Sequence, residues 1–245
     1  MTLDLNTTII AAKLSEWIYL ATLKAPLIVL TFLSKGSTQA ALLTDGYRYF
    51  LVFRGTELNK PEDLHTDLNI ISEYLNPTTF VHRGFYQAYL SIQEEVNQAV
   101  AKLPANAPLY VCGHSLGGAL AVIASTALHR PVEACITFGC PKVGNKAFYA
   151  LMRAPYCRVV NDNDLVPSIP SGILLIIRTK IIKRHWLDSW YTQAGSLYWF
   201  RDSGMTQKYT MFHRHSFRDH NIKEYLQRLY DYRVKIHAVD VSKDR

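Results

Sequence analysis

A serine flanked by two glycines is the residue of this sequence best suited to act as a nucleophile. Ser115 lies at the centre of Gly113-His114-Ser115-Leu116-Gly117, which is the Gly-x-Ser-x-Gly pattern of a nucleophile elbow. The two glycines remove side chains that would clash on so sharp a turn. An apolar strand-like run precedes the pattern and a helical run follows it, so N–H groups of that helix point at a developing oxyanion. The sequence therefore predicts nucleophilic catalysis by Ser115, with the N–H of Leu116 as an oxyanion donor.

A serine hydroxyl needs a base within hydrogen-bond reach, and the base needs an acid that orients it. On a chain with this elbow, the acid and then the base follow the nucleophile. Spacing alone leaves two acids after the apolar run at 158–161, Asp162 and Asp164. Several late histidines could serve as the base, with a preference for those between 213 and 220: His185, His213, His215, His220 and His237.

Strand-like and helix-like segments alternate along the chain and must position these groups. Apolar, β-branched runs predict strands at 39–44, 47–53, 109–114, 134–138, 158–161 and 197–200, with a hairpin turn at Asp45-Gly46. Helical spacing predicts helices at 7–23, 85–103, 116–128, 146–152 and 219–232, with fraying after 233, and segment 25–33 is expected to pack on the core as helix or strand. The alternation predicts an α/β fold with a mostly parallel central sheet and helices on both faces. Since no linker or repeat interrupts it, we expect one domain over 1–245.

Four motifs, in this order, resemble those of the class 3 lipases, the fungal-type lipase family, and the resemblance covers about residues 45–232. The resemblance implies the α/β-hydrolase fold. It implies that Asp164 is the acid and that His220, just before the final helix, is the base. His215 is the alternative candidate for the base. The resemblance also implies that Thr56 is the second oxyanion donor. The motifs are Phe-Arg-Gly-Thr at 53–56, Gly-His-Ser-Leu-Gly-Gly-Ala-Leu-Ala at 113–121, Thr-Phe-Gly-Cys-Pro-Lys-Val-Gly-Asn at 137–145 and Asn-Asp-Leu-Val-Pro at 163–167.

The same resemblance implies an activity, which is serine-dependent hydrolysis of the carboxylic esters of acylglycerols, through an acyl-enzyme on Ser115 and without a cofactor. Phospholipase A1-type cleavage and short-chain carboxylesterase activity are the alternatives. A non-catalytic lipid-binding relative is the candidate from a different class.

Two segments are expected to lie at the substrate side of the molecule. The family places a lid after the oxyanion threonine, which implies a lid at 57–79, although this segment is rather charged here. The segment 171–190 combines an apolar run at 173–177 with Lys180, Lys183, Arg184 and Trp186. It is interpreted either as a lipid-facing insertion or as a buried strand or helix with a solvated end.

Composition limits the partners and the compartment. The chain has 245 residues, of which 49% are hydrophobic, and a net charge of +7 with its basic excess in the C-terminal half. That excess favours anionic lipid surfaces or is simply a solvated basic surface, and no nucleic-acid-binding motif accompanies it. Four cysteines without a metal or disulfide pattern predict buried free thiols. With no evident signal peptide or spanning segment, we expect a cytoplasmic or peripherally membrane-associated protein, and export by another route stays open.

Two further histidines lie beside the motifs, and both are predicted to be structural. His114 belongs to the elbow itself, and His82 belongs to a loop before a helix. No set of histidine, cysteine and carboxylate residues has the spacing of a metal site. The sequence makes no prediction of oligomeric state.

Overall fold

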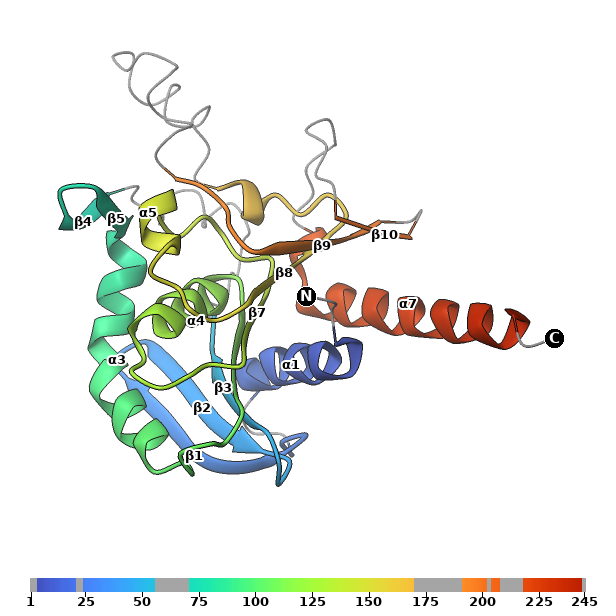
Figure 1. The fold of residues 1–245 in the computed structure, drawn as a ribbon, viewed down its shortest axis with the longest axis horizontal. Helices are drawn as coiled ribbons and strands as arrows, with labels where there is room; N and C mark the ends of the chain where they lie inside the picture. The colour runs from blue at the N-terminus through green and yellow to red at the C-terminus, as the bar shows by residue number, and fades with distance from the viewer. Residues whose placement is uncertain are drawn as a thin grey trace, which may run out of the picture.

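The computed structural model describes residues 4–20, 24–55, 71–169, 191–201, 204–207 and 218–243, with side chains up to residue 236. Within these ranges an eight-stranded sheet has the order β1-β2-β3-β6-β7-β8-β9-β10, and β4 and β5 form a separate hairpin (Figure 1). The strands are β1 (Ile28–Lys35), β2 (Thr38–Thr44), β3 (Tyr49–Phe53), β4 (Ser72–Asn76), β5 (Thr79–His82), β6 (Leu109–His114), β7 (Ala134–Phe138), β8 (Tyr156–Asn161), β9 (Ser196–Arg201) and β10 (Gly204–Thr206). The helices are α1 (Leu5–Trp17), η1 (Ile18–Leu20), α3 (Arg83–Ala101), α4 (Leu116–Ala127), α5 (Lys146–Tyr149), η2 (Val166–Ser168), η3 (Arg218–His220) and α7 (Ile222–Lys243).

The middle of the sheet is parallel, as the alternation of elements predicts. Strands β3, β6, β7, β8 and β9 pair in parallel, while β1 and β2 at one end and β10 at the other pair antiparallel with their neighbours. Strand β6 lies between β3 and β7, and its Gly113 pairs with Phe53 and Thr137. The carboxyl ends of parallel strands meet at one edge of a sheet. The residues that follow β3, β6, β7 and β8 therefore gather there.

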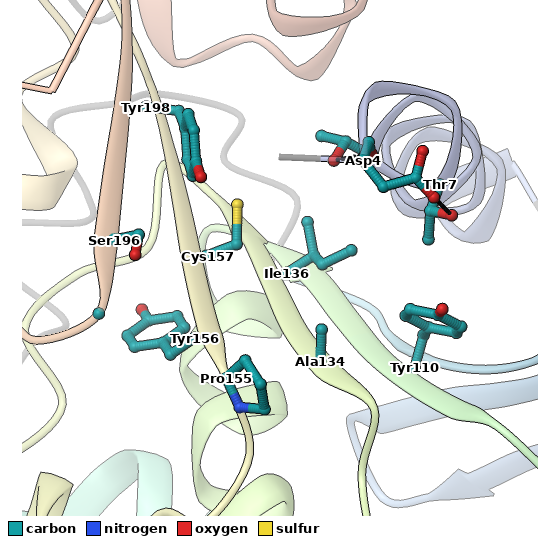
Figure 2. A pocket seen from close by; sticks show the side chains of 12 residues that line it. Asp4, Thr7, Tyr110, Ala134, Ile136, Pro155, Tyr156, Cys157, Ser196 and Tyr198 are labelled. Atoms are coloured by element: carbon teal, nitrogen blue, oxygen red, sulfur yellow. Dashed lines mark hydrogen bonds between the residues drawn. The ribbon is translucent and has the colours of Figure 1, made fainter. Parts of the chain in front are cut away.

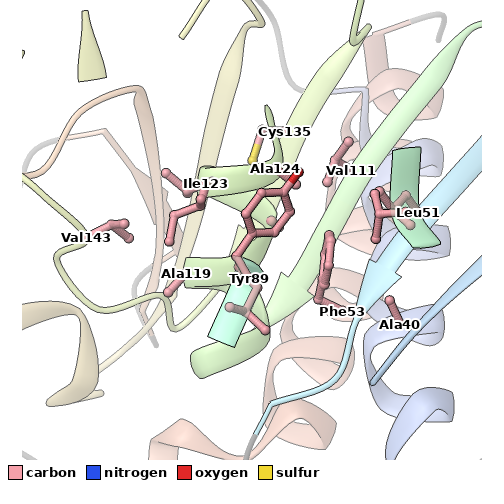
Figure 3. Packing of buried hydrophobic residues seen from close by; sticks show 14 of the residues in the cluster. Ala40, Leu51, Phe53, Tyr89, Val111, Ala119, Ile123, Ala124, Cys135 and Val143 are labelled. Atoms are coloured by element: carbon pink, nitrogen blue, oxygen red, sulfur yellow. The ribbon is translucent and has the colours of Figure 1, made fainter. Parts of the chain in front are cut away.

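Helices cover both faces of the sheet, which confirms the predicted α/β architecture. Residues that alternate along a strand point to opposite faces. In β3, Leu51 and Phe53 pack with α3 and α4, whereas Phe50 and Val52 pack with α1 and α7. Figure 3 shows Leu51 and Phe53 beside Tyr89 of α3 in the first of these two clusters. Both faces of the parallel strands are thus buried, which explains their continuous apolar sequences.

Several segments differ from the prediction. Segment 25–33 contains most of β1, an edge strand on which Ile28 is 65% exposed and Phe32 is 41% exposed, so it is covered only in part. Helix α5 ends at Tyr149 rather than 152, and α1 ends at Trp17 before the short η1. Helix α7 continues to Lys243 instead of fraying after 233 and projects beyond the body of the molecule (Figure 1). Its first turns are anchored by burial, and neither glycine nor proline interrupts the residues that follow.

Of the two predicted substrate-side segments, one is described in part and the other not at all. Of segment 57–79, residues 71–79 contain β4, the following turn and the start of β5, while 57–70 lie outside the described residues. The whole of 171–190 lies outside them as well. In the part of the chain that the structure describes, no helix combines the length and the apolar character required to cross a membrane.

Candidate active site

Ser115 occupies a strained turn between β6 and α4. Its φ of 57° and ψ of −127° are adopted by a non-glycine residue only where the surroundings hold it. A Cβ on Gly117 would lie 2.2 Å from the carbonyl oxygen of Phe53, and a Cβ on Gly113 would lie 2.3 Å from the backbone of Gly117. The N–H of Ser115 donates to the carbonyl oxygen of Phe138 at 3.0 Å. Gly117 therefore lets the turn pack directly on β3, and Gly113 lets the start of α4 pack directly on β6.

Leu116 begins the helix that follows the nucleophile. The N–H groups of a first helical turn have no acceptor within the helix. Here the N–H groups of Gly118 and Ala119 donate to the carbonyl oxygen of Ser115. This arrangement fits the N–H of Leu116 as an oxyanion donor. Thr56, the predicted second donor, lies outside the described residues, which reach Gly55 at the end of the adjacent strand β3.

An acid and a base from distant parts of the chain meet at the same sheet edge. Nδ1 of His220 lies 2.8 Å from Oδ2 of Asp164, and both side chains are buried. Asp164 sits on the turn after β8, where its N–H donates to the carbonyl oxygen of Asn161 at 2.9 Å. His220 ends η3, and the side-chain amide of Asn161 donates to the carbonyl oxygen of the preceding Asp219 at 2.9 Å. The turn that carries the acid is thus bonded to the segment that carries the base.

The structure also distinguishes the two acids that spacing left open. Asp162 turns its carboxylate toward Arg228 at 3.7 Å and Arg201 at 4.0 Å, whereas Asp164 contacts His220. Among the candidate bases, only His220 has a described side chain. His185, His213 and His215 lie outside the described residues, and His237 lies in the part of α7 whose side chains are not described.

Tyr225 is a site residue that the sequence analysis missed. Its hydroxyl donates to Oδ2 of Asp164, the same oxygen that accepts from His220. Burial, followed by the charge of Asp164, raises the pKa of Tyr225 well above its usual 10, so the phenol remains a donor. The only sequence signal was its place on the first buried face of the predicted final helix, which is equally typical of an ordinary core residue.

Hydrogen bonding determines which nitrogen of His220 is free. A carboxylate only accepts hydrogen bonds, so Nδ1 carries the proton that is shared with Asp164. In a neutral imidazole Nε2 then has the free lone pair. This Nε2 is buried and has no hydrogen-bond partner among the described residues, so it is not bonded to the hydroxyl of Ser115. Such bonds are often long or misaligned before the substrate is bound.

His82 has the structural role predicted for it. Its Nδ1 accepts a hydrogen bond from the N–H of Phe85 at 3.4 Å and so caps the N-terminus of α3. Burial lowers the pKa of His82 to about 4, which keeps the ring neutral and its Nδ1 able to accept.

Gly139, after β7, is required by the acid–base pair, and its replacement by alanine is expected to be harmful. A Cβ there would lie 2.7 Å from Oδ2 of Asp164 and 2.8 Å from Nδ1 of His220, and φ is +57°. We expect Gly139→Ala to lower kcat about 100-fold, the scale of a 1 Å misplacement. We also expect it to lower the free energy of unfolding by about 1–3 kcal/mol through backbone strain. Ester turnover and thermal unfolding measure the two effects.

Gly36 provides the matched control for this prediction. It has the same φ of +57°, but a Cβ there would meet nothing within 4 Å. Gly36→Ala should therefore reproduce the backbone strain without affecting kcat. Equal activities of the two alanine variants would show that Gly139 matters only for its backbone conformation.

A cavity of about 320 Å³ lies at the other edge of the sheet (Figure 2). It is lined by the first residues of the parallel strands, including Tyr110, Ala134 and Cys157, and by Asp4 and Thr7 of the N-terminal segment. Tyr110 precedes Ser115 by five residues of extended chain, or about 16 Å. This cavity is therefore separate from the candidate site. Within the described ranges, no group of three or more histidine, cysteine and carboxylate side chains is placed to hold a metal ion.

Comparison with known proteins adds to this geometry. Residues 50–173 match the family described as Lipase (class 3). Toxin TseL of Vibrio cholerae is 42% identical over 101 residues, which is 38% of this chain and 15% of that protein. A lipase of Rhizomucor miehei is 30% identical over 169 residues, covering 63% of this chain and 42% of that protein. The matched region thus spans less than half the length of either relative.

A solved structure has the same overall fold. It is a triacylglycerol lipase whose catalytic centre is formed by a serine protease triad. It superimposes with a TM-score of 0.62 and 26% identity over 81% of this chain and 78% of that one.

Proposed function

Because this chain belongs to the class 3 lipase family, we propose that it hydrolyses the carboxylic esters of acylglycerols through an acyl-enzyme on Ser115. The observation that supports this best is the 2.8 Å contact between Asp164 and His220 at the sheet edge from which Ser115 emerges. A nucleophile, a base and an acid that orients the base are the parts that acyl transfer requires.

In the proposed reaction, Nε2 of His220 takes the proton of the Ser115 hydroxyl as Oγ attacks the ester carbonyl carbon. The carbonyl oxygen becomes an oxyanion that the N–H of Leu116 stabilises, with Thr56 proposed as the second donor. Asp164 stabilises the imidazolium that forms on His220. The imidazolium then protonates the leaving alcohol. A water molecule, activated by the same base, releases the fatty acid and restores the serine.

The proposed substrate class rests on two of the similar proteins, of which one is named a lipase and the other a triacylglycerol lipase. A basic surface favours a second candidate, the phospholipids. The segment that carries His220 also carries the exposed residues Arg218, Lys223 and Lys235, and cationic residues attract anionic lipid headgroups. We propose peripheral contact with lipid surfaces through this segment.

An ester panel tests the proposal. The substrates are p-nitrophenyl esters from acetate to palmitate, a triacylglycerol emulsion, and vesicles of anionic or zwitterionic phospholipid. We expect kcat/KM to rise with acyl length and the emulsion to be hydrolysed. Hydrolysis of the p-nitrophenyl acetate ester alone would indicate a short-chain carboxylesterase. Faster hydrolysis of anionic phospholipid vesicles than of the triacylglycerol emulsion would indicate a phospholipase. A chain that hydrolyses none of these esters, and whose Ser115 resists labelling by a fluorophosphonate, would be non-catalytic.

A further inference from the structure

His114 has hydrogen-bond partners on both ring nitrogens, and both partners belong to distant parts of the chain. It is the last residue of β6, immediately before the nucleophile, and is 6% exposed. Its Nε2 lies 2.7 Å from the backbone carbonyl oxygen of His220, and its Nδ1 lies 3.1 Å from the hydroxyl of Tyr19 in η1. The imidazole therefore connects the N-terminal segment to the backbone of the proposed base.

The partners determine where the proton of His114 resides. A carbonyl oxygen only accepts hydrogen bonds, so Nε2 must be the donor. In a neutral imidazole Nδ1 is then an acceptor, and the hydroxyl of Tyr19 donates to it. Tyr19 thus stabilises the one neutral tautomer in which His114 can hold the carbonyl of His220.

The charge of His114 matters because it lies beside the proposed base. The two imidazole rings have centroids 4.5 Å apart, so a cation on His114 would oppose the imidazolium that forms on His220 during the reaction. Burial, and then the neighbouring His220, hold the pKa of His114 well below its usual 6.5. Among the described residues, the other ionisable groups around the ring are Tyr225 at 5.9 Å between centroids, Tyr19, and Asp164 beyond His220.

Tyr19 also contacts the segment after β3 that leads to Thr56, the proposed second oxyanion donor. A Cβ on Gly55 would lie 2.2 Å from the Tyr19 hydroxyl and 2.7 Å from the carbonyl oxygen of His114. The guanidinium of Arg54 lies over the Tyr19 ring at 5.9 Å. One hydroxyl therefore packs against the backbone before Thr56 while it bonds to the imidazole behind Ser115.

From these contacts we propose that Tyr19 and His114 are positioning residues for the reaction. Tyr19 keeps His114 in its neutral Nε2–H tautomer, and His114 in turn holds the backbone of His220 in place for proton transfer. This inference rests on the proposed function, because it concerns how the base of that reaction is held.

A pair of substitutions separates this role from simple packing. Tyr19→Phe removes the hydroxyl that donates to His114 and keeps the ring, and it is expected to lower kcat about five- to tenfold, the scale of one hydrogen bond, with KM for a small soluble ester unchanged. His114→Gln retains an amide that can donate to the carbonyl of His220 and cannot become a cation, so it should keep most of the activity. In the His114→Gln background, Tyr19→Phe should have little further effect, because no tautomer remains to be selected.

The matched control is Tyr110→Phe. Tyr110 is another half-buried tyrosine, it lies on the same strand as His114, and its ring stacks on Phe50. This change should leave kcat as in the wild type. If Tyr19→Phe lowers kcat by the same factor in the wild-type and the His114→Gln backgrounds, the tyrosine acts by packing alone and the proposal is wrong.

Nitrogen-15 NMR of the histidine rings tests the tautomer without any turnover. The His114 signal, assigned by its loss in His114→Gln, should show the proton on Nε2 in the wild type and a mixed or altered state in Tyr19→Phe. A proton on Nδ1 in the wild type would overturn the inference. An inactive wild type that nevertheless shows the expected tautomer would instead count against the proposed function.

Discussion

Replacement of Ser115 by alanine is expected to abolish ester hydrolysis while leaving the fold intact. Loss of the nucleophile in a serine hydrolase lowers kcat by about 10⁵- to 10⁶-fold. Alanine keeps the Cβ and removes only a hydroxyl from a side chain that is 2% exposed and held at a φ of 57°. The melting temperature should therefore be unchanged or higher, as is common where an active site is strained. Turnover of a soluble ester, fluorophosphonate labelling and thermal unfolding measure these outcomes.

Ser125 is the matched control for this prediction. It is also buried and lies in the helix that follows the nucleophile, where its hydroxyl donates to the carbonyl oxygen of Ala121 at 2.8 Å. Ser125→Ala should keep full turnover and labelling. If Ser115→Ala still hydrolyses esters at the wild-type rate, another residue is the nucleophile.

The second large effect is expected for Asp164→Asn, a change of one atom in a buried carboxylate. Oδ1 of Asp164 accepts from the N–H of Val166 at 2.9 Å, and Oδ2 accepts from His220 and Tyr225. An amide has only one oxygen, so in either orientation its NH₂ group faces a donor. When that NH₂ faces His220, Nδ1 must accept and the proton moves to Nε2. The histidine then cannot take the serine proton.

We expect this substitution to lower kcat about 10⁴-fold, the scale known for the wrong tautomer in a serine triad. KM for a soluble ester should change much less, because the substrate does not contact the acid. Glu95→Gln is the control, since it makes the same chemical change in an ion pair with Lys35 at the surface and should not affect kcat. Loss of activity in both variants would indicate a general effect of charge.

Much of the fold could be predicted from local sequence. Strands β6 and β7 have the predicted bounds, and β2, β3 and α3 differ from theirs by one or two residues, because short continuous apolar runs mark the buried strands and apolar residues at a spacing of about 3.6 mark the helix. The predicted end of α7 was wrong, since the apolar residues after 233 alternate with polar ones over 234–238 and do not continue the helical spacing of the first turns. The exposure of β1 was also missed. Its apolar residues look the same in sequence whether or not a neighbour covers them.

The sequence by itself determined the elbow, because Gly113, Ser115 and Gly117 are close in the chain and a sharp turn depends on local backbone geometry. The spacing of residues left two candidates for the acid, Asp162 and Asp164, and several histidines as candidates for the base. A family resemblance then selected among these candidates. Only the tertiary structure decided that Asp164, and not Asp162, contacts His220. It also revealed that Tyr225, His114 and Gly139 surround this pair. These contacts join residues far apart in the chain, and side-chain direction across a packed interface leaves no periodic signal in the sequence.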